Sequence, residues 1–215
     1  MRVLMIGAGG VGTSAALIAS RRDFFDAWVV ADYDLARATA LAERVADERF
    51  VAAQVDAGDA EAVAQLCRAH HITHVLNVVD PRFVMGIFNG ARLAGADYLD
   101  TAMSLSAKHP EHPYSQVGVK LGDDQFAQAP EWEAAGRLAL VGIGVEPGLA
   151  DVFARYAYDH LFSDINELGV RDASDMEVIG HHFAPSFSIW TVIEECLNPP
   201  VIWEQDRGWY TTEPF

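Results

Sequence analysis

Residues 3–12 read Val3-Leu4-Met5-Ile6-Gly7-Ala8-Gly9-Gly10-Val11-Gly12. The four apolar residues that open this stretch predict a buried strand, and the Ala, Leu and Ile residues of 13–20 predict a packed helix. The glycines therefore follow the spacing Gly-x-Gly-x-x-Gly between a strand and a helix. A second apolar run, residues 27–31, ends at Asp32, which follows Gly12 by 20 positions. Together these features indicate a dinucleotide-binding turn.

Each residue of this pattern has a physical task in holding a dinucleotide. Gly7 permits the tight turn, Gly9 lets the backbone approach a pyrophosphate, and Gly12 lets helix and strand pack closely. The N–H groups that open the helix face the anion. Asp32 would accept hydrogen bonds from ribose hydroxyls and would repel a 2'-phosphate. We therefore predict NAD as the cofactor, with NADP as the alternative because Arg37 lies one helical turn away.

The predicted cofactor site continues along the edge of a parallel sheet. Asp56 follows the third strand-like run and residues 77–81 follow the fourth, so both could line the adenine and nicotinamide ends of the dinucleotide. The predicted cofactor-binding residues are Gly7, Ala8, Gly9, Gly10, Val11, Gly12, Asp32, Tyr33, Asp56, Ala57, Asn77, Val78, Val79 and Pro81.

Strand-like and helix-like segments alternate over residues 1–145. This alternation predicts an α/β fold, a Rossmann doubly wound parallel sheet with right-handed crossovers. The expected strands are 3–6, 27–31, 49–55, 74–79, 97–100 and 138–143. The expected helices are 13–20, 35–46, 60–69, 83–94 and 125–137, and residues 104–116 are expected to be a loop within this domain.

A second region is predicted over residues 146–215, as the first part of an incomplete α+β substrate or dimerisation domain. Its expected helices are 149–161 and 190–197, its expected strands are 166–170 and 176–180, and a hairpin is expected over 201–210. So short a region supports only a small core, so we expect it to open a larger domain.

The composition excludes several classes of partner. The 31 acidic residues outnumber the 15 basic residues and give a net charge of −16, which repels nucleic acid and anionic membranes. The two cysteines, Cys67 and Cys196, form no CxxC spacing, so neither a disulfide framework nor a metal site is predicted. The chain shows no signal-peptide pattern and no long apolar run, which predicts a cytoplasmic protein.

Several local patterns resemble the saccharopine dehydrogenase family, which includes lysine 6-dehydrogenases and is related to carboxynorspermidine and homospermidine enzymes. They are the glycine-rich turn and residues 30–34 (VADYD), 55–59 (VDAGD), 77–81 (NVVDP), 97–100 (DYLD) and 144–148 (GVEPG). The resemblance implies a Rossmann domain followed by an α+β domain, with substrate bound between them. It also implies a homodimer that transfers hydride between a nicotinamide cofactor and the C–N bond of a small lysine-derived amino acid, saccharopine or lysine.

Such a reaction needs groups that bind a carboxylate and manage protons. The predicted catalytic residues are Asp100, Glu146 and His181. The predicted substrate-binding residues are Asp100, Thr101, Pro147, Gly148 and Ser186. The Glu-Pro-Gly stretch precedes a helix whose first N–H groups could hold a substrate carboxylate. On a strand, His182 would face away from His181, so at most one of the two would enter the site.

Two other hypotheses remain open from the sequence. A polyamine-forming relative, of the carboxynorspermidine or homospermidine type, would take a cationic substrate that suits the acidic chain. Alternatively, the chain is an inactive NAD-binding fragment or sensor.

Overall fold

The computed structural model describes residues 1–171, 177–182 and 189–214, and the chain forms two compact units. The first unit comprises Met1–Leu105 and Leu121–Pro147, and the second comprises Ser106–Lys120 and Gly148–Phe215. Residues 104–116 were expected to be a loop within the first domain, whereas residues 106–120 belong to the second unit. Contacts within that unit explain this, because Ala107 and Val119 form an antiparallel bridge and Thr211 donates to the Pro113 carbonyl at 2.9 Å.

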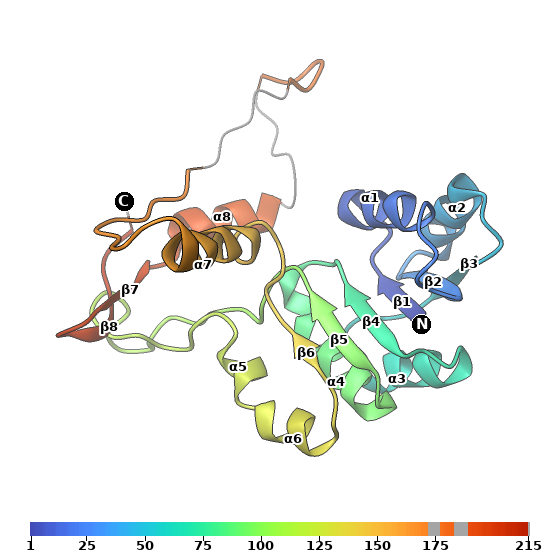
Figure 1. Ribbon diagram of the computed structural model, residues 1–215, viewed down its shortest axis with the longest axis horizontal. Coiled ribbons are helices and arrows are strands. Elements are labelled where there is room, and N and C mark those ends of the chain that lie inside the picture. Colours follow the sequence, from blue (N-terminus) through green and yellow to red (C-terminus); the bar gives the residue numbers. More distant parts are fainter. Residues whose placement is uncertain (172–176, 183–188, 215) are drawn as a thin grey trace. The chain divides into compact units, whose positions relative to one another are not determined.

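The first unit is built on a six-stranded parallel sheet (Figure 1). Its strands are β1 (Arg2–Ile6), β2 (Ala27–Asp32), β3 (Phe50–Gln54), β4 (His74–Asn77), β5 (Asp97–Asp100) and β6 (Ala139–Leu140). Their order is β3-β2-β1-β4-β5-β6, which confirms the predicted Rossmann fold. The chain changes direction across the sheet between β1 and β4, and a ligand crevice forms at the carboxyl ends of strands at such a point.

Helices cover both faces of this sheet. They are α1 (Gly10–Ala19), α2 (Leu35–Val45), α3 (Ala60–Ala69) and α4 (Val84–Ala94), with the short 3₁₀ helix η1 (Pro81–Phe83) before α4. Leu4 and Ile6 of β1 lie in one buried cluster with side chains of α3 and α4, and Val3 and Met5 lie in another with side chains of α1 and α2. Burial on both faces explains the continuous apolar runs of the central strands.

Two predicted elements of the first unit differ in the structure. The helix expected over residues 125–137 is two short helices, α5 (Asp123–Phe126) and α6 (Ala129–Ala134), because Pro130 has no N–H to continue a helix from α5. The strand expected over residues 138–143 ends at Leu140. Gly142 adopts a φ of +69° and its N–H donates to the carboxylate of Asp100, so the chain leaves the sheet there.

The second unit contains α7 (Leu149–His160), α8 (Ile189–Leu197) and the antiparallel hairpin β7 (Val201–Glu204) and β8 (Gly208–Thr211). The hairpin was predicted at this position. The strand predicted for residues 166–170 is wrong, because this stretch is exposed and pairs with no strand. Of the strand predicted for 176–180, the described residues 177–180 form no strand; Ile179 and Gly180 lie in a turn, in which Gly180 has a φ of +85° and the His181 N–H donates to the Val178 carbonyl at 3.1 Å. None of the helices in the described ranges is both long enough and apolar enough for a membrane span.

Candidate cofactor-binding site

The glycine loop at the end of β1 needs glycine at two positions for packing. Gly7 has a φ of +116°, and a Cβ placed there would lie 2.8 Å from the carbonyl oxygen of Val78. A Cβ on Gly12 would overlap the carbonyl oxygen of Gly7. These two glycines therefore bring α1, β1 and the segment after β4 close together, as the sequence predicted for such a turn.

The other two glycines of the loop leave space in front of the helix. A Cβ built on Gly9 or Gly10 would meet no heavy atom within 4 Å. Helix α1 has no side-chain cap at Gly9, and the Thr13 N–H donates to the Gly9 carbonyl at 2.8 Å. The N–H groups of Gly10, Val11 and Gly12 precede this first helical donor, so they have no acceptor within the helix and remain available to a ligand. An open helix N-terminus without a Cβ in front of it fits a pyrophosphate.

Asp32 lies beside this loop at the end of β2. Its Oδ2 accepts the N–H of Ala8 at 2.8 Å, and its Oδ1 accepts the N–H of Asp34 at 3.0 Å. These two bonds fix the carboxylate at the position predicted for contact with the ribose hydroxyls. Arg37, the cation that could hold a 2'-phosphate, lies 4.0 Å from the Asp34 carboxylate. The preference for NAD over NADP stays a prediction.

The predicted adenine-side residues lie at the neighbouring strand ends. Tyr33 follows β2 and is 75% exposed. Asp56 is exposed after β3, and its Oδ1 accepts the Gly58 N–H at 2.9 Å. Tyr33 and Asp56 line one groove beside β3 and α3. Ala57 packs against α4, since a Cβ on Gly86 would overlap its carbonyl oxygen. Of the three predicted residues Tyr33, Asp56 and Ala57, the first two therefore present more surface to a ligand.

The segment after β4 borders the glycine loop from the other side. A Cβ on Gly7 would lie 2.9 Å from Cγ1 of Val79, and the Val78 N–H donates to the Ile6 carbonyl at 3.0 Å. Asn77 is 1% exposed, and its Oδ1 accepts the Val79 N–H at 3.1 Å. Pro81 begins η1 immediately beyond. Residues 78 and 79 therefore lie where the nicotinamide end is predicted, whereas Asn77 is buried beneath them.

Asp100 does not have the surroundings expected of a catalytic or substrate-binding residue. It is 1% exposed. Its Oδ2 accepts from the Tyr98 hydroxyl and from Nε2 of Gln125, both at 2.8 Å, and its Oδ1 accepts the Gly142 N–H at 2.6 Å. Burial raises the pKa of this carboxyl group, and the three hydrogen bonds oppose that shift. Both oxygens are occupied inside the protein, so the predicted contact with substrate is corrected to a buried structural position.

No sequence pattern connects Asp100 with Gln125 or Gly142, which are 25 and 42 positions away. Tyr98 was the one detectable partner, because residues two apart on a strand share a face.

Glu146 and Pro147 lie on a tight turn beyond β6. The Gly144 N–H donates to the Pro147 carbonyl at 2.9 Å, and the Glu146–Pro147 peptide bond is cis. A Cβ on Gly144 would overlap the carbonyl oxygen of Thr101, so the turn packs against the backbone that follows β5. Glu146 is exposed. This turn, residues 142–147 (hereafter the Glu146 turn), therefore presents a carboxylate to solvent next to Thr101.

The remaining predicted residues belong to the second unit. The Gly148 N–H donates to the carboxylate of Asp151 at 2.9 Å. Asp151, a residue of α7 itself, therefore already occupies this N–H group at the start of the helix, which was expected to hold a substrate carboxylate. His181 and His182 are exposed and follow a turn rather than lying on a strand, so the argument about opposite strand faces is wrong. Ser186 lies outside the described residues. The role of His181 stays a prediction.

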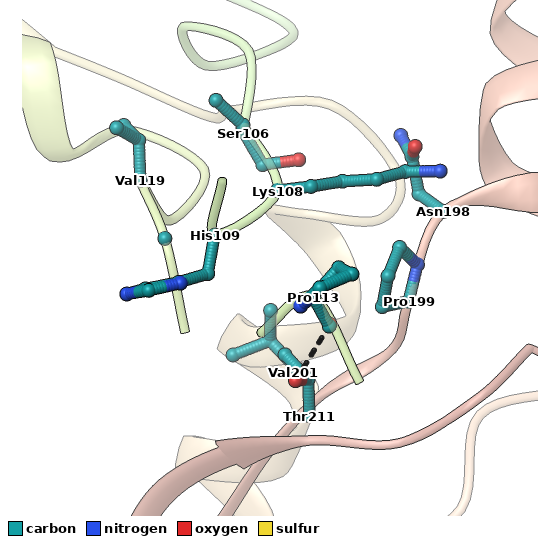
Figure 2. Close-up of a pocket in the computed structure, with 11 residues that line it drawn as sticks. Ser106, Lys108, His109, Pro113, Val119, Asn198, Pro199, Val201 and Thr211 are labelled. Atoms are coloured by element: carbon teal, nitrogen blue, oxygen red, sulfur yellow. Dashed lines mark hydrogen bonds between the residues drawn. The ribbon is translucent and has the colours of Figure 1, made fainter. Parts of the chain in front are cut away.

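The second unit also contains a small cavity (Figure 2). It has a volume of about 20 Å³, which is the size of one water molecule. Lys108 at its wall donates to the Leu197 carbonyl at 3.3 Å. This cavity is too small for a dinucleotide or an amino acid. In the parts of the chain that are described, no three His, Cys, Asp or Glu side chains cluster as metal ligands would.

A comparison of the sequence with known families agrees with the geometry of this site. Residues 3–140 match the saccharopine dehydrogenase NADP binding domain. The chain belongs to this family. This match confirms the predicted resemblance. The cofactor of the first unit is a nicotinamide dinucleotide.

Members of related enzyme groups match the chain over nearly all of its length. Carboxyaminopropylagmatine dehydrogenase of Synechocystis sp. is 28% identical over 218 residues, covering 100% of this chain and 51% of that protein. Carboxynorspermidine synthase of Vibrio cholerae is 28% identical over 215 residues, covering 95% of this chain and 50% of that protein. The chain thus spans about half the length of these relatives.

A solved structure supports the fold of this family member. The saccharopine dehydrogenase (L-Glu forming) of Saccharomyces cerevisiae superimposes with a TM-score of 0.56 at 21% identity, covering 74% of this chain and 31% of that one. At this identity the similarity concerns the fold alone.

Proposed function

We propose that the chain forms the dinucleotide-binding part of an oxidoreductase that transfers hydride between nicotinamide and the carbon of a C–N bond. The observation that carries the proposal is the open helix N-terminus at Gly9 and Gly10, with the Asp32 carboxylate fixed beside it. Bound nicotinamide would supply the hydride chemistry. The N–H groups at the start of α1 would hold the pyrophosphate, and Val78 and Val79 would flank the nicotinamide end.

We further propose that the substrate is a carboxylated polyamine or the imine from which it forms. Two relatives that match 95–100% of the chain are named for such compounds, carboxyaminopropylagmatine and carboxynorspermidine. The net charge of −16 attracts a polycationic substrate and would disfavour an anionic one. A lysine-derived amino acid, saccharopine or lysine, is the second candidate, supported by the family to which residues 3–140 belong.

In either case Glu146 is the side chain that we propose for substrate binding or proton transfer. Its carboxylate is exposed on a turn at the same sheet edge as the cofactor loop. A carboxylate there could hold a substrate ammonium group or exchange a proton with the amine nitrogen during hydride transfer. Thr101 lies under the same turn and could hydrogen-bond the substrate.

The test is a substrate profile with the complete protein that contains this chain. Oxidation of NADH and NADPH would be followed by absorbance with a diamine and an aldehyde-bearing amino acid, and the reverse reaction with saccharopine or lysine. We expect turnover that requires both the diamine and the aldehyde. Turnover of saccharopine or lysine alone would favour the second candidate, and saturable dinucleotide binding without any turnover would favour the sensor hypothesis.

Replacing Glu146 by glutamine tests the residue assignment. The E146Q variant should lose about tenfold or more in kcat/KM if Glu146 binds a substrate ammonium group, and about 10²–10⁴-fold if it transfers a proton. The matched control is Glu131→Gln, because Glu131 is also exposed but lies on α6. Equal activity of the two variants would remove Glu146 from the site.

A further inference from the structure

The buried side chains around Asp100 form one hydrogen-bonded network, here called the Asp100 network: Asn77, Tyr98, Asp100 and Gln125. Nδ2 of Asn77 donates to the Tyr98 hydroxyl at 2.9 Å, and that hydroxyl donates to Asp100 at 2.8 Å. Gln125 donates to the same carboxylate oxygen at 2.8 Å. All four residues are 1–2% exposed.

Two backbone N–H groups fix the direction of the side-chain hydrogen bonds in this network. The Val79 N–H donates to Oδ1 of Asn77, which leaves the Asn77 amide nitrogen to donate to Tyr98. The Tyr98 proton must then go to Asp100. The Ser104 N–H donates to Oε1 of Gln125 at 2.8 Å, which turns the Gln125 amide nitrogen toward Asp100.

Position 100 therefore requires a group that only accepts hydrogen bonds. It receives two side-chain donors on one oxygen, and it receives the Gly142 N–H on the other. A carboxylate meets this requirement, whereas an amide would set one donor against another. A buried polar network is stable only when each member has a partner, so a change at one position should disturb the others.

The backbone groups at the two ends of the network belong to the two parts of the site. Val79 is next to the glycine loop, where a Cβ on Gly7 would touch its side chain. Gly142 begins the Glu146 turn, and the backbone carbonyl of Asp100 also accepts the Ile143 N–H at 2.9 Å. One buried chain of hydrogen bonds thus connects the nicotinamide side of the site with the turn that carries Glu146.

We propose that Asp100 is a positioning residue that, through Tyr98 and Asn77, holds the segment after β4 and the Glu146 turn in one fixed arrangement. The identification of the Glu146 turn as the substrate side rests on the proposed function. The connection between that turn and the dinucleotide site does not rest on it. Measurements of dinucleotide binding and of amide hydrogen exchange therefore test this connection separately from activity.

The experiment uses Tyr98→Phe, which removes only the hydroxyl that joins Asn77 to Asp100 and keeps the ring packed against Phe88. The second variant is Asp100→Asn, which keeps the side-chain shape and replaces one of the two acceptor oxygens by an amide nitrogen. This nitrogen would face a hydrogen-bond donor on either side of the carboxylate position. The control is Val63→Ala, which weakens the buried core and removes no hydrogen bond of the network. Each protein is compared for dinucleotide affinity by nicotinamide fluorescence, for amide hydrogen exchange and for unfolding by urea.

We expect Y98F and D100N to weaken dinucleotide binding by about tenfold, the effect of losing one well-placed hydrogen bond. Exchange should become faster at Val79 and Gly142 together, by more than the loss of global stability explains. The V63A control should lose stability and keep its affinity. If the substrate profile finds activity, kcat of Y98F should fall more than its KM changes, because Glu146 would be misplaced.

The proposal is overturned if both variants fold, bind the dinucleotide within about twofold of the unchanged protein and show exchange like V63A. If neither variant folds, amide hydrogen exchange of the unchanged protein tests the proposal instead. The amides of Val79, Ser104 and Gly142 should then exchange with one common opening free energy, and unrelated values would overturn the proposal. Failure to turn over any substrate would refute the proposed function and leave these measurements valid.

Discussion

Replacing Gly9 by alanine adds one methyl group in front of the first turn of α1. The backbone at Gly9 has φ −81° and ψ −159°, a conformation that alanine adopts without strain. The new Cβ would meet no protein atom within 4 Å. The methyl group therefore fits the free protein and occupies only the space that we assign to the pyrophosphate.

The two expected effects have opposite signs. The folded protein without cofactor should gain about 0.4–1 kcal/mol of stability, since alanine restricts the unfolded chain more than glycine does. Binding should lose one backbone hydrogen bond to a charged phosphate, which is worth about 1.5–3 kcal/mol. This loss corresponds to a dissociation constant about 10- to 150-fold higher for NAD or NADP.

Gly12→Ala is the matched control, because it places the same methyl group one helical turn away. Its Cβ would overlap the Gly7 carbonyl oxygen, so this variant should lose about 1–3 kcal/mol of stability from overpacking. Urea unfolding without ligand and calorimetric titration with NADH and NADPH measure both quantities. A Gly9→Ala protein that binds either dinucleotide as tightly as the unchanged chain would refute the placement of the pyrophosphate.

Three further predictions concern single side chains. Asp32→Ala should weaken NAD binding much more than NADP binding, and fluorescence titrations that show an equal loss for both would remove the preference for NAD. Burial raises the pKa of the Cys67 thiol to about 12, so a thiol reagent near neutral pH should modify only the exposed Cys196 of the native chain; two rapidly reacting thiols would contradict this. Burial also raises the pKa of Asp100 above its ordinary 3.8, because the cost of burying the charge exceeds the gain from the three hydrogen bonds that the carboxylate accepts, so ionisation on balance opposes folding. The unchanged protein should lose stability relative to Asp100→Asn as the pH rises from about 4 through the folded-state pKa, and a pH-independent difference in urea unfolding would contradict the buried carboxylate.

Glu146 and Gly148 show which property of a site cannot be predicted from the sequence. Glu146 and Gly148 were both expected to meet substrate because they adjoin a helix start. In the structure Glu146 is exposed, but the Gly148 N–H is bonded to Asp151. A sequence pattern identifies which groups are chemically able to bind a ligand, and it does not identify which of them the protein itself already occupies.

The amino-acid sequence alone determined the strand, glycine turn and helix at the amino terminus, the parallel sheet and the place of Asp32. These features depend on apolar periodicity and glycine geometry within short stretches of chain, which are visible in the residues themselves. Only the tertiary structure decided that Asp100 is buried, because its partners Gln125 and Gly142 come from segments 25 and 42 residues away. It also decided that residues 106–120 pair within the second unit, since Thr211, which bonds to Pro113, is 98 residues away along the chain.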